Sequence, residues 1–165
     1  MKLEFDVKVT EKDLYSFNIE QAYKGSQGVI SLLFAVLLVA AAVLSAQKGN
    51  TGYVVLYIIV GILVLLYVPF SLKGRVRMIM KTNEVFSKPL HFEIDEKSIN
   101  VSQGEEMAQL PWEQVYRLVA NDKRILIFSN RKNAYILSKE QLGDSYEPLK
   151  ELAGSTLEKY RLKIK

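Results

Sequence analysis

Residues Gly28 to Leu72 read GVISLLFAVLLVAAAVLSA, then QKGNTG, then YVVLYIIVGILVLLYVPFSL. Neither apolar run contains a charged residue. At about 1.5 Å rise per residue, a helical run of this length spans roughly 30 Å, the thickness of the hydrocarbon core of a bilayer. A helix on the surface of a small soluble domain would keep a polar face, and neither run has one. The sequence therefore predicts a hairpin of two membrane-spanning helices, over residues 28–46 and 53–72.

The chain divides into four segments around this hairpin. We expect an N-terminal strand and interfacial helix over 1–24, the transmembrane hairpin over 25–72, a basic juxtamembrane helix over 73–87 and a cytoplasmic domain over 88–165. The break between the apolar runs carries only Lys48, whereas five basic residues follow the second run: Lys73, Arg75, Arg77, Lys81 and Lys88. Basic residues concentrate on the cytoplasmic side of membrane helices. We therefore expect a multi-pass protein of the plasma membrane with both termini in the cytoplasm.

The N-terminal segment shows two periodicities. Apolar and polar residues alternate from Leu3 to Val9, which is typical of a half-buried strand. One strand is not stable alone, so this strand needs a partner sheet, and the C-terminal segment is the candidate. Thr10 then suits the N-cap of a helix, with carboxylates in the first turn. We expect that helix to lie along the membrane interface or to continue into the first span.

The C-terminal segment has the pattern of short strands followed by a helix. Strands are predicted over 91–95, 98–103, 107–120 (interrupted at Pro111 and Trp112), 125–128 and 134–137, with turn residues between them. Leu149, Leu152, Ala153, Thr156, Leu157 and Tyr160 then recur at helical spacing. The predicted fold class is α+β: a membrane hairpin followed by a small antiparallel sheet or barrel that a C-terminal helix caps.

Several of these motifs resemble the YcxB-like family of bacterial membrane proteins. The motifs are FEIDEKSINV at 92–101, a turn at Gly104, LPWEQVYRLV at 110–119, ILIF at 125–128 and AYILSK at 134–139. The step from Trp112 to Val115 is the sharpest of them. The resemblance implies a two-span hairpin with a pleckstrin-homology-like (PH-like) domain, and it supplies no catalytic residues. One position departs from the family pattern: Ser138 stands where a proline is usual before the lysine.

No constellation of residues points to catalysis. The chain has no cysteine and one histidine, His91, which excludes thiolate chemistry and a multi-histidine metal site. No phosphate-binding loop or catalytic triad is present. We expect a protein that is not an enzyme, with no catalytic residue, cofactor or metal. The segment from Lys73 onward holds 17 basic and 13 acidic residues, and this mild excess argues against nucleic-acid binding.

Four residues are candidates for recognition. Lys73, Arg77 and Lys81 repeat every four residues and would share one side of a helix. They could contact anionic lipid headgroups, although the ordinary orientation signal explains them more simply. Trp112 could be a recognition residue, but its position after Pro111 beside a strand favours the core.

Two hypotheses of function remain open. In the first, the bilayer anchors the chain and its PH-like domain binds a peptide or protein partner at the inner face of the membrane. In the second, the chain is an accessory subunit that docks onto a larger membrane complex through its hairpin. The small residues Ala42 and Gly61 would allow close helix packing, and packing within the hairpin is preferred to dimerisation. The sequence leaves the oligomeric state and the identity of the partner open.

Overall fold

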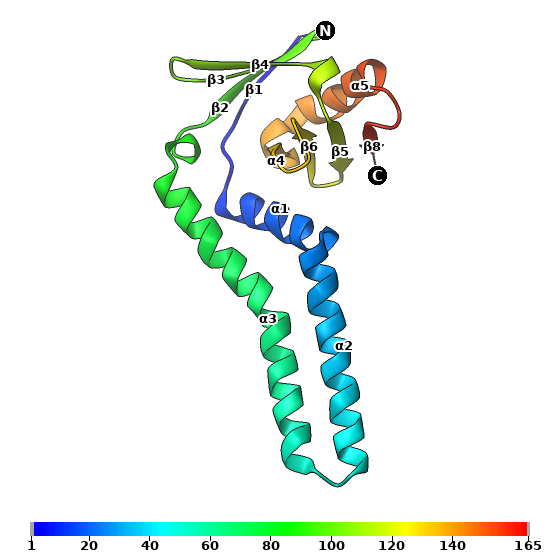
Figure 1. Ribbon diagram of the computed structural model, residues 1–165. Helices are drawn as coiled ribbons and strands as arrows, with labels where there is room; N and C mark the ends of the chain where they lie inside the picture. The colour runs from blue at the N-terminus through cyan, green and yellow to red at the C-terminus, as the bar shows by residue number, and fades with distance from the viewer. Residues whose placement is uncertain (1, 165) are drawn as a thin grey trace. The chain divides into compact units, whose positions relative to one another are not determined.

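The computed structural model describes residues 2–164, which form two compact units (Figure 1). The strand unit comprises residues 2–13 and 80–164, and the helical unit is Leu14–Ile79. The strand unit is thus assembled from both sides of the apolar stretch. The fold is α+β, as the sequence predicts.

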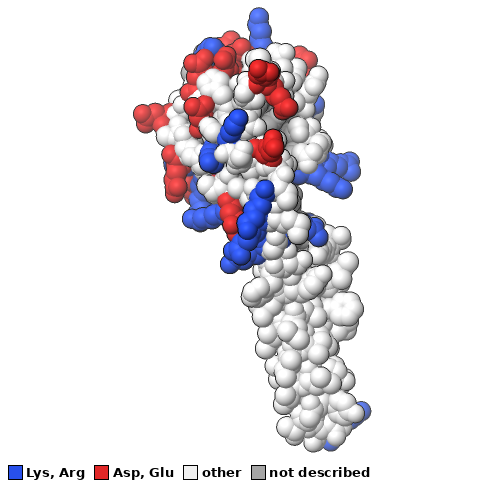
Figure 2. Space-filling view, turned by 90° about the vertical axis from the view of Figure 1, so that its left-hand side faces the viewer, with Lys and Arg blue, Asp and Glu red and all other residues white. Residues whose placement is uncertain are grey.

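The helical unit is dominated by two long apolar helices. Helix α2 covers Ser26–Gln47 and α3 covers Thr51–Thr82, and both are long and apolar enough to cross a membrane. The face seen in Figure 2 shows their long surface free of charged side chains over most of its length. Most of their large apolar side chains are exposed within the protein itself. Exposed apolar surface of this extent is typical of a region that contacts a membrane or another protein.

Helix α3 is longer than its predicted apolar run. It continues through Pro69 and past Leu72 to Thr82, 32 residues in all, which corresponds to about 48 Å. The predicted juxtamembrane helix 73–87 is therefore no separate helix. It consists of the last turns of α3 and a short 3-10 turn, η1, over Glu84–Phe86.

A tight corner joins α2 to the preceding helix α1, which covers Glu11–Lys24. Helix α1 begins as predicted, because the Thr10 hydroxyl accepts a hydrogen bond from the Asp13 N–H at 3.2 Å. At the corner, a Cβ atom on Gly28 would lie 2.6 Å from the Tyr23 Cα. Real Cβ atoms do not approach backbone atoms so closely, so the corner requires glycine at this position.

The first sheet contains the strand that precedes the hairpin. Its order is β1 (Leu3–Val7), β2 (Leu90–Ile94), β3 (Ser98–Gln103) and β4 (Glu106–Pro111), and every pairing is antiparallel. The predicted pairing of the N-terminal strand with the C-terminal segment is confirmed. Helices α1, α2 and α3 therefore all lie in the connection between two neighbouring strands, β1 and β2.

The interruption predicted at Pro111 and Trp112 is confirmed, but the strands after it form a second sheet in place of the single sheet or barrel that the sequence predicts. The predicted strand 107–120 splits into β4 and β5 (Arg117–Asn121), which belong to different sheets, because the 3-10 turn η2 (Trp112–Gln114) separates them. Strands β6 (Arg124–Phe128) and β7 (Ala134–Ser138) follow β5 in antiparallel pairing. An unpredicted strand, β8 (Leu162–Ile164), adds to β5 in parallel.

The C-terminal helix is shorter than predicted. After the short elements α4 (Lys139–Leu142) and η3 (Gly143–Ser145), helix α5 runs from Tyr146 to Thr156. Its face of Leu149, Leu152 and Ala153 is buried as predicted, whereas Tyr160 lies beyond the helix and is 71% exposed. The chain turns after Leu157 and continues into β8.

One core joins both sheets to α5. In Figure 1 the strands of the first sheet run across those of the second. Phe92 of β2 and Tyr135 of β7 meet edge to face across the core, with ring centroids 5.5 Å apart. Val115 and Leu118, predicted to be internal, are fully buried. The strand unit thus has a hydrophobic core of its own.

Candidate functional site

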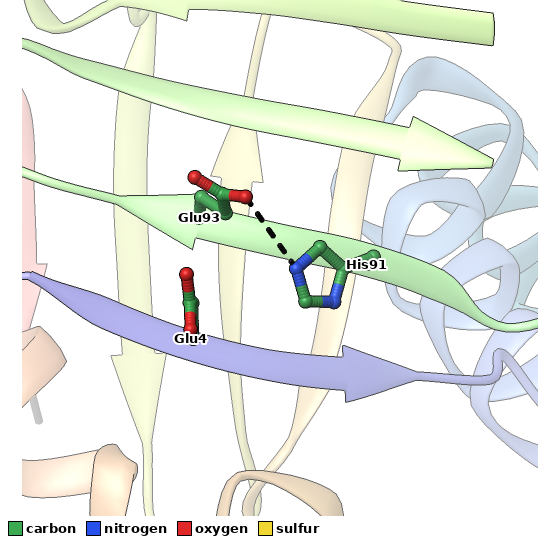
Figure 3. A group of neighbouring side chains, drawn as sticks. All are labelled: Glu4, His91 and Glu93. Carbon is green, nitrogen blue, oxygen red and sulfur yellow. Dashed lines mark ion pairs between the residues drawn. The ribbon is translucent and has the colours of Figure 1, made fainter. Parts of the chain in front are cut away.

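The outer face of β1 and β2 gathers ionisable side chains. The strand register places Glu4 opposite Glu93 and Asp6 opposite His91. Donor atoms of Glu4, His91 and Glu93 all lie within 4.8 Å of one another, and Figure 3 shows them on the two neighbouring strands. His91 Nε2 is 3.7 Å from a Glu93 carboxylate oxygen, and Nδ1 is 2.8 Å from an Asp6 oxygen.

Carboxylates and an imidazole are groups that could hold a divalent cation. Here, however, the Lys2 ammonium lies between the two glutamates, 2.7 Å from Glu4 and 3.0 Å from Glu93. Hydrogen bonds to Glu4 and Glu93 raise the pKa of Lys2, and the hydrogen bond from Lys2 lowers the pKa of Glu4. Two like charges directly opposite on neighbouring strands would repel, and Lys2 removes that repulsion. This exposed network of Lys2, Glu4, Asp6, His91 and Glu93, called the clasp below, connects β1 to β2 through ion pairs.

His91 takes part in the same clasp. The hydrogen bond to Asp6 raises the pKa of the imidazole, and the charge of Asp6 acts in the same direction. The charged form of His91 is thus favoured beside this face. Sequence reasoning missed the cluster because Glu4 and His91 lie on opposite sides of the apolar stretch. The signal available in the sequence was the polar alternation of Leu3–Val9, whose polar positions are the ones that face His91 and Glu93.

Trp112 belongs to the core, as the preferred interpretation predicted. Its side chain is only 3% exposed. The indole N–H donates a hydrogen bond of 2.7 Å to the Asp95 carbonyl, which ties η2 to the turn between β2 and β3. The ring therefore offers almost no surface to a partner.

The predicted basic stripe lies on one continuous helix. Lys73, Arg77 and Lys81 all belong to α3, four residues apart, and all three are exposed. Because residues at this spacing fall on neighbouring turns, their side chains share one side of the helix.

The first sheet ends in an open edge. Strand β4 pairs with β3 on one side, and no strand in the described part of the chain pairs with its other side. Glu106, Met107, Ala108 and Gln109 are exposed, and Met107 reaches 79%. An unpaired edge can accept a further strand from another chain.

A pocket of about 420 Å³ opens where β5 begins, beside the turn between β6 and β7. Its wall includes Tyr116, Arg131, Tyr160 and Arg161. The two tyrosines are 44% and 71% exposed. Sequence reasoning did not bring these residues together in one site, because they come from three separate segments of the chain.

Arg161 forms the rigid side of this pocket. Its Nη1 donates hydrogen bonds to the carbonyls of Glu113 at 2.8 Å and Val115 at 3.3 Å. Its Nε donates to the Tyr160 hydroxyl at 3.0 Å, and its guanidinium lies 5.4 Å from the centre of the Tyr160 ring. The turn before β8 is therefore fixed to the end of η2.

A comparison with protein families found a match within the strand unit. Residues 94–153 match the model of a family described as YcxB-like protein. The match runs from the last residue of β2 into α5. The resemblance expected from the sequence is thus confirmed over residues 94–153, which are similar to this family. No curated protein and no solved structure matches the chain.

Proposed function

We propose that this chain is a membrane-anchored binding module that presents a PH-like domain to a peptide or protein partner at the inner face of the plasma membrane. The pairing of β1 with β2 carries the proposal. These two strands flank the apolar hairpin, so the hairpin anchors the domain through two connections.

The same pairing bears on topology. Two strands that pair in one sheet lie on the same side of a membrane, so both ends of the hairpin face one compartment. The basic residues after the second apolar run, from Lys73 onward, support the cytoplasm as that compartment. Lys73, Arg77 and Lys81 then lie where they can contact anionic headgroups, each contributing about 1 kcal/mol.

The strand order supports a PH-like domain. Four antiparallel strands, β1 to β4, are followed by β5 to β7 in a second sheet and then by α5. Two crossed sheets closed by a C-terminal helix are compatible with the PH-like domain that the family resemblance implies. Strand β8 is an addition to that arrangement.

Cysteine labelling tests the topology. The chain has no cysteine of its own, so one introduced residue is the sole target of a membrane-impermeant maleimide. In intact cells, Asn50→Cys should react from outside, whereas Ser102→Cys and Lys132→Cys should react only after lysis. External labelling of Ser102→Cys would contradict the proposal.

Crosslinking tests the binding role. A photo-crosslinking residue placed at exposed positions of the strand unit should capture a partner, and the same partner should bind after the hairpin is replaced by an unrelated one. Loss of the partner with the replaced hairpin would instead favour the accessory-subunit hypothesis.

One observation favours that alternative. A groove of about 390 Å³ runs between α2 and α3, and Ala35, Ala42, Gly61 and Leu65 are among the residues that line it. A third apolar helix could pack there, so Ala42→Leu would abolish docking of the chain onto a larger membrane complex. The preferred proposal predicts that this substitution leaves partner binding unchanged.

A further inference from the structure

We infer that the pocket between Tyr116, Arg131 and Tyr160 is the partner-binding site and that it accepts an acidic peptide segment. This inference rests on the proposed function and names the chemistry of its partner. The pocket lies wholly within the strand unit.

The side chains of the pocket suit recognition of a peptide. Tyr116 and Tyr160 expose large rings that are polar at one end, and tyrosine and arginine are enriched where proteins bind other proteins. The volume of about 420 Å³ falls within the range of binding pockets.

Arg131 supplies the charge for recognition. Its side chain is exposed, and it forms no hydrogen bond or ion pair with any residue that the structure describes. A guanidinium group offers two parallel donors to a carboxylate, which makes the contact both strong and directional. Arg161, by contrast, already donates to the carbonyls of Glu113 and Val115.

The walls of the pocket are fixed before a ligand arrives. The Asn130 side chain accepts hydrogen bonds from the N–H groups of Lys132 at 2.9 Å and Asn133 at 2.8 Å, which fixes the turn that presents Arg131. The Tyr116 N–H donates to the Phe128 carbonyl at 2.8 Å. Little conformational freedom is therefore lost from the walls on binding.

The composition of the pocket favours a peptide over a lipid headgroup. Glu113 lines the pocket together with the two arginines, so the positive charge is small. Attraction to an anionic membrane surface depends on clustered lysines and arginines. Two tyrosines beside one unpaired arginine fit a carboxylate with an adjacent apolar or aromatic residue.

The test uses the full chain in detergent micelles and a short fluorescein-labelled peptide, rich in glutamate with a central phenylalanine. Fluorescence anisotropy should show binding, and Arg131→Ala should weaken the affinity about tenfold, as expected when a charge-assisted hydrogen bond is lost. Tyr160→Ala should also weaken binding. Lys132→Ala is the matched control: it removes the same charge from the next position of the same turn, outside the pocket, and should change the affinity less than about twofold.

Three results would overturn the inference. The first is equal affinity for Arg131→Ala and the unmodified chain, and the second is equal losses from Arg131→Ala and Lys132→Ala. The third is displacement of the peptide by phosphatidylserine, but not by phosphatidylcholine, when either lipid is added to the micelles. Crosslinking in cells separates this inference from the proposed function. A partner captured equally by the unmodified chain and by Arg131→Ala would refute the pocket and leave the binding module intact. Absence of any partner in both would refute the proposed function as well.

Discussion

Phe5 stacks on Phe92, with ring centroids 5.6 Å apart and an interplanar angle of 20°. The two residues are also direct partners in the register of β1 and β2. The whole apolar hairpin lies between them in the sequence. This contact therefore links the segment before the hairpin to the core of the strand unit after it.

Phe5→Asp should destabilise the strand unit by about 2–4 kcal/mol, because it replaces an aromatic contact with a charge against the core. A denaturant titration of the full chain in detergent measures the loss in the free energy of unfolding. Phe5→Leu should cost less than about 1.5 kcal/mol. Lys8→Asp introduces the same carboxylate at an exposed position and also removes one positive charge, so it is a control that perturbs charge at least as much. Equal stability of Phe5→Asp and Lys8→Asp would show that β1 does not pack on the core.

Short elements limited what the sequence could predict. The alternation of Leu3, Phe5 and Val7 was sufficient to predict β1 and its need for a partner sheet. Strand β8 has three residues, which is too few to show a period. Tyr160 matched the helical spacing, yet the chain leaves α5 earlier, where the hydroxyls of Ser155 and Thr156 bond to the Leu152 carbonyl.

The sites were harder to predict than the fold. The clasp around His91 depends on the register of β1 against β2, which places Glu4 opposite Glu93. The pocket at Tyr116 depends on how η2, the β6–β7 turn and the start of β8 meet. Periodicity indicates which face of a strand is buried, but it does not indicate which strands become neighbours.

The clasp predicts a pH dependence. The hydrogen bond to Asp6 raises the pKa of His91 in the folded protein. The stabilisation of the fold by this pair is therefore fully present below the pKa of His91 in the unfolded chain, about 6.5, and is lost as pH rises through the pKa of the folded state. Asp6→Asn should lower the pKa of His91 toward 6.5. His91 is the only histidine of the chain, so NMR of its imidazole measures the pKa in the unmodified chain and in Asp6→Asn. An unchanged titration in Asp6→Asn would remove Asp6 as the cause.

Trp112→Ala should cost on the order of 3–5 kcal/mol, because the buried ring and its bond to the Asp95 carbonyl are both lost. Thermal unfolding of the full chain in detergent measures the change. If Trp112 were instead an exposed recognition residue, the variant would melt like the unmodified chain and would lose only partner binding. Tyr116→Ala offers the comparison, since the exposed Tyr116 ring should contribute to binding and little to stability.

Gly28→Ala should strain the corner between α1 and α2, since the new Cβ would lie 2.6 Å from the Tyr23 Cα and 2.9 Å from the Ala22 carbonyl oxygen. We expect a loss of about 1–3 kcal/mol, as for other overpacked sites. Gly52→Ala is the control, because no atom beyond the adjacent backbone of its own helix lies within 4 Å of the added Cβ and alanine favours helix. Equal melting temperatures for the two variants would show that the corner tolerates a side chain.

The hairpin lies between β1 and β2 in the sequence, and this leads to a last prediction: the strand unit should fold without the hairpin. A chain in which a short Gly-Ser linker replaces residues 11–87, joining residues 2–10 to 88–164, retains β1 and the other described strands. Because Val7 and Leu90 are direct partners at the end of this ladder, a short linker can close it as a hairpin.

We expect this linked chain to be soluble and to unfold cooperatively. Residues 88–164 alone lack β1, so the edge of β2 is unpaired and Phe92 loses its stacking partner Phe5. An exposed edge of this kind favours aggregation. The segment without β1 should therefore be less stable, by several kcal/mol, and prone to self-association. Denaturant unfolding and sedimentation velocity compare the two. Equal stability and equal monomer content would mean that β1 is dispensable, and the hairpin would then be an appendage at one end of the domain rather than an insertion within it.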